Sequence, residues 1–231
     1  GFFSPLVDDC EIYDLLHSAG VKTIHEISRC KDYMEYQTMS EANFNLVLHH
    51  EARFAAEDFH NRLQIPFIEL RRLYQIDKIE NQYHALGNAL GVAFYDEKYK
   101  KQAEDALEKF RQKCPDASFA IGECLNADPF ELSLALIRYG FSVPEIYGTI
   151  TVENFTYIRS LEKISPETKV FSNMEPTMIY YDPAKSDVNL AIGKDACYYH
   201  PDCPYVMWNG EEQPYGYAGV RRLFEQLLEV V

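Results

Sequence analysis

The sequence predicts an α/β protein made of two parallel-sheet units that face each other across a cleft. Short apolar runs rich in β-branched residues alternate along the chain with amphipathic segments of helical length. Such alternation implies parallel sheets with right-handed crossovers. The alternation occurs twice, each time in the order helix, strand, helix, strand. A chain of 231 residues also has room for two small domains.

The first domain is predicted to cover residues 1–93. Asp8 and Asp9 can cap a helix that ends at Gly20. Residues 21–27 carry β-branched side chains, which favour a strand. The other elements expected in this half are strands at 43–50 and 65–70 and helices at 30–42, 51–63 and 77–90.

The second domain is predicted to cover residues 94–231, beginning with a linking helix at 96–113. Pro129 stands in the first turn of a helix, where a proline costs no hydrogen bond. The last helix, at 217–231, has a regular apolar stripe opposite charged residues. The other expected elements are helices at 129–139 and 152–164 and strands at 118–122, 142–149, 169–172, 189–193 and 205–209.

The charge balance argues against two classes of partner. Acidic residues outnumber basic ones by 36 to 22, which gives a formal net charge of −14. Nonspecific nucleic-acid binding needs a basic footprint, and an anionic membrane surface attracts basic segments. We therefore expect neither nucleic acid nor membrane as a partner. No apolar stretch approaches the roughly 18 residues of a membrane span.

The cysteines and the N-terminal residues indicate where in the cell the protein is expected. The six cysteines are widely scattered, which is typical of a reduced intracellular protein, so a cytoplasmic location is expected. The N-terminus lacks the basic start and apolar run of a signal peptide. The chain begins without Met and enters a helical pattern almost at once, which indicates a piece of a longer protein.

Common nucleotide and hydrolase motifs do not occur in the sequence. Gly122 is followed by Glu123, Cys124 and Leu125, which matches neither a dinucleotide fingerprint nor a P-loop. A G-x-S-x-G elbow is missing as well. Nucleotide hydrolysis and serine-esterase chemistry are therefore disfavoured.

Polar groups at strand ends are the first candidates for a site. In open α/β sheets, ligands bind outside the carboxyl ends of the strands. This rule selects His49 and His50, the loop that begins with Gly122 and Glu123, and the pair Trp208 and Asn209. The histidines could ligate a metal or transfer protons. Strand residues alternate between faces, so at most one histidine is expected to face the cleft. A structural or solvent-exposed role for both is the alternative.

A C-x2-H-x2-C spacing near the end of the chain is a candidate metal site. Cys197, His200 and Cys203 carry thiolate and imidazole donors, which suit zinc or an iron–sulfur centre. A fourth ligand is not visible nearby, and structural zinc sites usually use two separated pairs. The alternative is a tight loop with buried thiols.

A glycine-rich turn opens the last predicted helix. Tyr215 and Gly216 lie in this turn, and the free N–H groups of a helix start favour an anion. A plain turn and cap is the alternative interpretation.

A series of short motifs follows one order along nearly the whole chain. They are Asn45-Leu46-Val47, 64–68, Ile76-Asp77-Lys78-Ile79, 118–123, 139–143, 187–193 and 214–219. This order resembles the nitrogenase component 1 family, which includes cofactor-maturation scaffolds and dark-operative protochlorophyllide reductase subunits. The resemblance implies two Rossmann-like three-layer domains, corresponding to the second and third domains of a family subunit.

The resemblance also implies a cofactor and partners. The full-length complex would hold an iron–sulfur cluster or related metallocluster, which this fragment need not contain. A paralogous or identical subunit and an ATP-dependent iron–sulfur reductase would be the partners. Nitrogenase holds its cofactor with a cysteine just after the Asn-Leu-Val strand and a histidine after the last strand. This chain has His49 and His50 at the first place and Trp208 and Asn209 at the second.

The leading hypothesis is therefore a fragment of a nitrogenase component 1-like oxidoreductase or metallocluster scaffold that does not itself reduce dinitrogen. The alternative hypothesis is a two-lobed protein that binds a small ligand or metal without redox activity.

Overall fold

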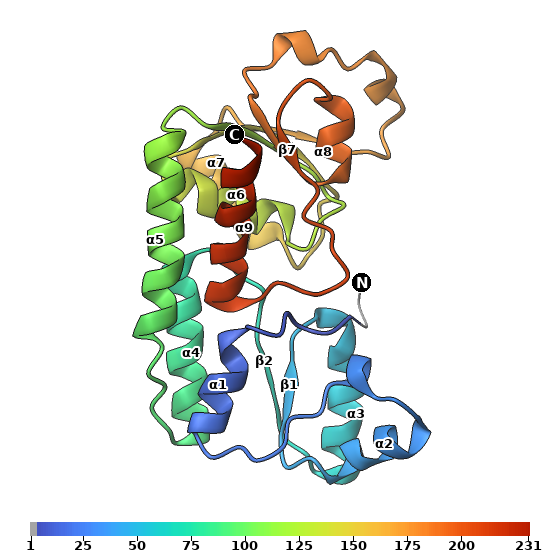
Figure 1. Ribbon diagram of the computed structural model, residues 1–231. Coiled ribbons are helices and arrows are strands. Elements are labelled where there is room, and N and C mark those ends of the chain that lie inside the picture. The colour runs from blue at the N-terminus through green and yellow to red at the C-terminus, as the bar shows by residue number, and fades with distance from the viewer. Residues whose placement is uncertain (1–3) are drawn as a thin grey trace.

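The computed structural model of the protein describes residues 4–231, which form two lobes stacked along one direction (Figure 1). One lobe contains a sheet of two strands and the other a sheet of five strands. Every strand pair in the two sheets is parallel. The predicted α/β class, with parallel sheets in Rossmann-like layers, is confirmed.

The five-stranded sheet has the order β5-β4-β3-β6-β7. Phe119 and Ile121 on its central strand belong to the same hydrophobic core as the helices α5, α6 and α9. Ala120 packs instead with Ala196 and Cys197 of α8, so helices cover both faces. The bounds are β3 (Ser118–Ile121), β4 (Ser142–Tyr147), β5 (Lys169–Phe171), β6 (Leu190–Ile192), β7 (Tyr205–Val206), α5 (Glu97–Lys113), α6 (Pro129–Arg138), α7 (Phe155–Ile164), α8 (Lys194–Tyr199) and α9 (Gly216–Val230).

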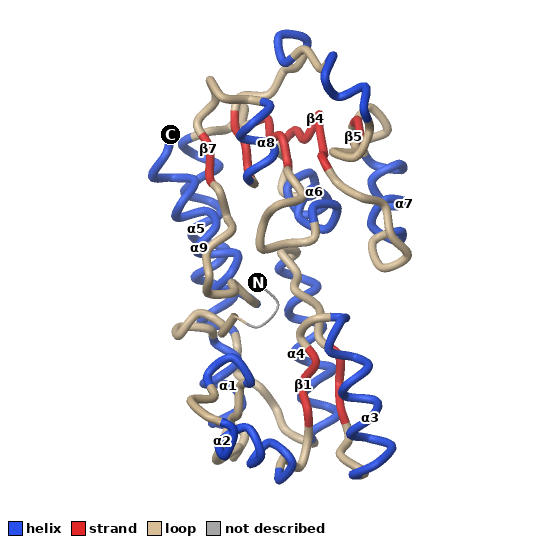
Figure 2. The backbone as a smooth tube through the Cα atoms, turned by 90° about the vertical axis from the view of Figure 1, so that its right-hand side faces the viewer, coloured by secondary structure: helices blue, strands red, loops and turns tan. Residues whose placement is uncertain are grey.

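The smaller lobe pairs β1 (Asn45–Val47) with β2 (Phe67–Glu69), in a register that sets Asn45 opposite Phe67. The crossover between them is α3, and Figure 2 shows β1 and α3 at the end opposite to β4 and β7. The lobe's helices are α1 (Glu11–Ser18), α2 (Tyr33–Gln37), α3 (Arg53–Leu63) and α4 (Ile76–Leu90).

Helices with strong periodic patterns form close to their predicted bounds. α4 buries Ile76, Ile79, Tyr83 and Leu86, which recur every three or four residues, and Gly91 caps its end with a φ of 69°. The predicted helices at 96–113, 129–139 and 217–231 likewise appear as α5, α6 and α9. The expected division between residues 93 and 94 stays a prediction.

The predicted strand at 21–27 is wrong. Residues 21–26 have no regular structure, and Ile27–Arg29 form a 3-10 turn. The carboxylate of Glu26 accepts hydrogen bonds from Ser28 and Arg29, so side chains and a local turn supply the contacts that a neighbouring strand would have supplied.

Further elements differ in extent from the prediction, and three of them have a clear local cause. The helix expected at 30–42 begins only at Tyr33, because Asp32 caps it by accepting a hydrogen bond from Glu35 N, and it tightens into a 3-10 turn at Thr38–Glu41. The helix expected at 51–63 starts as a 3-10 turn, His50–Ala52, before α3. The strand expected at 205–209 ends at Val206, and Trp208 takes a left-handed φ of 45°. Two more 3-10 turns occupy Pro176–Tyr180 and Pro183–Lys185.

Candidate functional site

A cleft of about 470 Å³ lies where the carboxyl ends of strands from both sheets approach each other. We call it the junction cleft. His49 and His50 line it after β1, Glu69 at the end of β2 and Leu70 to Arg72 after it, and Thr149 after β4. It is lined by Leu48, His49, His50, Arg53, Glu69, Leu70, Arg71, Arg72, Glu123, Ala127, Asp128, Pro129, Thr149, Thr151, Glu153, Asn154 and Tyr157.

Both histidines line the junction cleft, so the expectation that at most one faces it is wrong. Strand geometry ends at Val47, and the 3-10 turn that begins at His50 turns both rings to the same side. The two rings stack with centroids 4.5 Å apart. Burial lowers the pKa of His49, and the positive charges of His50 and Arg72 lower it further.

Glu123 also lines the junction cleft, whereas Gly122 is not among the described lining residues and lies against Asp195. Glu123 Oε1 accepts a hydrogen bond from Thr149 N at 3.0 Å. The carboxylate of Asp195 accepts hydrogen bonds from Glu123 N at 2.7 Å and Cys124 N at 3.1 Å. A Cβ on Gly122 would meet Asp195 Oδ1 at 2.0 Å, so this position needs glycine. The N–H groups of Glu123 and Cys124 are therefore already hydrogen-bonded to a carboxylate of the chain itself, Asp195.

Trp208 and Asn209 lie in a second pocket, of about 400 Å³, and not in the junction cleft. Trp208 is buried, and its Nε1 donates a hydrogen bond to Tyr74 Oη at 2.6 Å. Tyr74 Oη in turn donates to Asn126 O at 2.8 Å. The structure thus separates Trp208 and Asn209 from the two histidines that the strand-end rule grouped with them.

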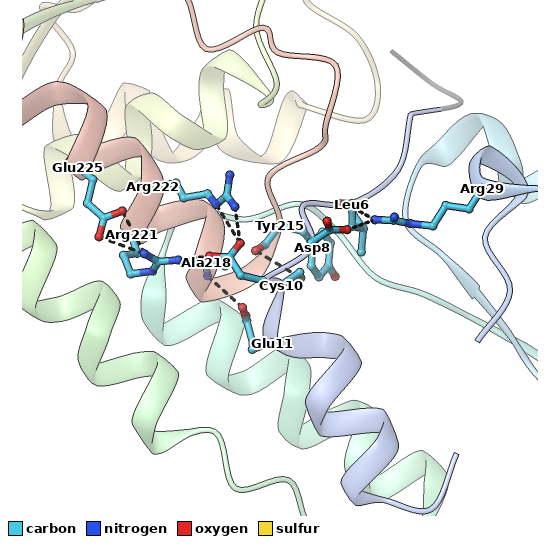
Figure 3. A network of polar contacts seen from close by, with 11 residues as sticks. Leu6, Asp8, Cys10, Glu11, Arg29, Tyr215, Ala218, Arg221, Arg222 and Glu225 are labelled. Carbon is cyan, nitrogen blue, oxygen red and sulfur yellow. Dashed lines mark hydrogen bonds and ion pairs between the residues drawn. The ribbon is translucent and has the colours of Figure 1, made fainter. Parts of the chain in front are cut away.

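Glu11 supplies the anion at the turn that opens α9 (Figure 3). Its carboxylate accepts hydrogen bonds from Tyr217 N at 2.5 Å and from Ala218 N at 3.0 Å, and Tyr83 Oη donates to it at 2.7 Å. Tyr215 is buried beside it, and Gly216 has a φ of 58° and leaves no room for a Cβ against Glu11. The start of α9 does favour an anion, and the carboxylate of Glu11 takes that position instead of a ligand.

The candidate metal ligands near the end of the chain do not converge. Cys197 lies in α8 and not in a tight loop, and burial raises its pKa to about 11. His200 Nε2 lies 2.9 Å from Glu145 Oε2 in the interior. Cys203 Sγ donates to Val188 O. Within residues 4–231, no three His, Cys, Asp or Glu side chains are placed to hold a metal ion. The short helix directs these side chains to separate partners.

Sequence reasoning missed the basic residues of the junction cleft. Arg53 binds both carboxylate oxygens of Glu69, through Nε at 2.7 Å and Nη2 at 2.8 Å. A hydrogen bond to Tyr157 raises the pKa of Arg71. Arg71 and Arg72 directly follow the predicted strand 65–70, so the strand-end rule applied there would have found them.

The donors of the junction cleft do not fit the iron–sulfur cluster that the sequence resemblance implies. Such clusters are held mainly by cysteine thiolates. None of the described residues that line the cleft is a cysteine. The side chains that are present carry imidazole, carboxylate and guanidinium groups, which suit proton transfer and the binding of polar ligands.

Comparisons with known proteins agree with this architecture. A solved structure of nitrogenase Cp1 at pH 6.5 has a TM-score of 0.72 and 19% sequence identity, and the match covers 100% of this chain and 58% of that chain. No curated protein sequence matches. Among residues 4–231, no helix has the length and apolar character needed to cross a membrane.

A structural match at 19% identity shows a shared fold, and a family model shows which protein family the chain belongs to. The model for nitrogenase component 1 type oxidoreductases matches residues 2–231, which is nearly the whole sequence. The two parallel-sheet lobes and the cleft at their strand ends are consistent with that match. The chain therefore belongs to the nitrogenase component 1 type oxidoreductase family.

Proposed function

We propose that this chain forms the ligand-binding cleft of a nitrogenase component 1-like oxidoreductase or metallocluster scaffold, and that it does not itself reduce dinitrogen. One observation carries the proposal. Within a family match over residues 2–231, the cleft at the strand ends presents His49, His50 and Glu123 but none of the described residues lining it is a cysteine. A metallocluster of the full-length complex then has its thiolate ligands outside this cleft.

The proposed partners follow from the family. The chain pairs with a paralogous or identical subunit and receives electrons from an ATP-dependent iron–sulfur reductase in the cytoplasm. In the cleft, the stacked imidazoles of His49 and His50 contact the ligand and can move protons to or from it. Glu123 accepts a hydrogen bond from Thr149 N, which holds the loops after β3 and β4 together at the edge of the cleft.

The test combines the full-length protein, its partner subunit and the reductase under dinitrogen without oxygen. We expect ATP-dependent reduction of the protein, followed by visible absorbance and electron paramagnetic resonance, without formation of ammonia. Ammonia in proportion to the electrons consumed would contradict the proposal. Reversible ligand binding without any electron uptake would contradict it too and would favour the two-lobed binding protein.

A matched pair of variants tests the role of the cleft histidines in this system. We expect the double substitution His49→Ala and His50→Ala to abolish turnover of the bound ligand while electron uptake from the reductase continues. His84→Ala, at an exposed position of α4, serves as the control and leaves turnover unchanged. Equal turnover in both variants would remove the histidines from the proposed site.

A further inference from the structure

Arg72 is a cation of the junction cleft with incomplete hydrogen bonding. Arg72 is among the residues that line the cleft, and the only hydrogen bond of its side chain among residues 4–231 runs from Nη2 to Gln213 Oε1 at 2.6 Å. Nε is shielded from solvent and has no hydrogen-bond partner within the same residues. Buried N–H groups are almost always paired, so this donor marks a position where a partner is missing.

Arg53, in the same cleft, shows what a complete arrangement looks like. Its Nε and Nη2 bind the two oxygens of the Glu69 carboxylate at 2.7 and 2.8 Å. Planar guanidinium groups favour this two-point contact with a carboxylate or phosphate. Arg72 presents the same pair of atoms, but only Nη2 is engaged, and its acceptor is a neutral amide.

The charge of Arg72 also lacks a counter-charge. Burial lowers its pKa, and the opposing influences come from the phenols of Tyr74 and Tyr215. Burial raises the pKa of both phenols, so they are neutral near pH 7. A buried charge without compensation is destabilising, and an anion at this place would offset that cost.

Three of the four carboxylates that line the cleft already have partners of their own, and the fourth, Glu153, is exposed to solvent. Glu69 pairs with Arg53, and Glu123 accepts from Thr149 N. Asp128 accepts from Phe130 N and Glu131 N at the start of α6. None of the four is hydrogen-bonded to Arg72, whose bond goes to Gln213, so a ligand is the remaining source of a matching anion.

We propose that Arg72 binds the oxyanion of a small carboxylate- or phosphate-bearing ligand in the junction cleft, next to His49 and His50. The inference rests on the proposed function in taking this cleft as the ligand site. A volume of about 470 Å³ accommodates a small molecule and not a macromolecule. The ligand's oxygens complete the contacts of the guanidinium, and the neighbouring imidazoles hold the rest of the ligand.

The test uses the full-length protein prepared without added metal, with citrate and inorganic phosphate as probes in isothermal titration calorimetry. Saturable binding of citrate alone identifies a carboxylate ligand, and saturable binding of phosphate alone identifies a phosphate ligand. Saturable binding of both supports the oxyanion site equally. Binding of neither probe overturns the inference.

Two variants locate the binding. Arg72→Met removes the guanidinium and is expected to weaken binding about tenfold or more, because a charge-assisted two-point contact is lost. Arg62→Met removes an exposed guanidinium of α3 that pairs with Asp58 at 3.2 Å, and it is expected to leave affinity unchanged. Equal affinity in the Arg72→Met variant and the wild type overturns the assignment to Arg72.

A measurement on the wild type covers the case in which Arg72→Met does not fold. Phenylglyoxal modifies arginines, and peptide mass mapping reports the rate at each one. We expect the probe that binds to slow the modification of Arg72 and to leave the rate at Arg62 unchanged. Equal protection of both arginines, or no protection of Arg72, overturns the inference. Neither measurement involves a cluster or a reductase, so its failure is distinguishable from failure of electron uptake.

Discussion

At the scale of single residues, two carboxylates of the chain itself occupy positions where the sequence predicts a ligand site. Glu11 fills the start of α9, and Asp195 fills the N–H groups of the loop after β3. The start of α9 satisfies the physical rule that led to the prediction there, because a carboxylate is itself an anion. The loop after β3 was selected only as a strand end. The identity of the acceptor could not be predicted, since Glu11 lies more than 200 residues away from the turn.

Replacing Glu11 tests how much this internal anion stabilises the fold. In Glu11→Ala, Tyr217 N and Ala218 N lose their acceptor inside the protein, and we expect the free energy of unfolding to fall by about 3 kcal/mol. Chemical denaturation measures the change. The control, Glu225→Ala, removes an exposed partner of Arg221 on the same helix and should cost less than about 1 kcal/mol. Equal losses in both variants would contradict the special role of Glu11.

At the scale of elements, predictability followed length and periodicity. α4, α5 and α9 each span at least four turns, so their apolar stripes identify them from sequence. α8 has six residues, too few for a helical period to show, so the sequence is consistent with a loop there. The junction cleft was predictable as a strand-end site. The position of Trp208 outside this cleft was not predictable, because the strand ends at Val206 and Trp208 takes a left-handed φ.

The junction between α6 and α4 predicts a dependence of stability on pH. Glu131 in α6 accepts hydrogen bonds from Tyr74 N at 2.9 Å and Gln75 Nε2 at 3.0 Å, just before α4 begins. Burial nevertheless raises the pKa of Glu131 from 4.5 to about 7. The folded protein then keeps a proton that the unfolded chain releases in this range. The free energy of unfolding should therefore fall as the pH rises from 4.5 to 7, by at most about 3 kcal/mol.

Denaturation at several pH values, compared between two variants, isolates this contribution. Glu131→Gln replaces the titrating group with an amide of similar shape, and its stability should vary less across that range. Glu104→Gln, at an exposed position of α5, should keep the slope of the wild type. An unchanged slope in Glu131→Gln would assign the pH dependence to other groups.

At the scale of the whole molecule, one hydrophobic core contains residues from both sides of the predicted division between residues 93 and 94. One core cluster includes Leu15 of α1 and Tyr83 of α4 together with Phe119 of β3 and Leu223 of α9. α3 buries only Ala56, and α2 has no buried residue. The smaller lobe therefore contains two kinds of element, those that share the common core and those that lie outside it.

Hydrogen exchange resolved by peptide tests whether the two kinds of element differ in stability. We expect amides of α4 to exchange with an opening free energy close to that of β3 and α9, because all three bury side chains in the same core. Amides of α2 and α3 should open at lower free energy, although they precede α4 in the same predicted domain. If α3 and α4 instead opened together, and below α9, residues 1–93 would unfold as one unit. The boundary predicted from sequence would then describe the stability of the molecule better than the shared core does.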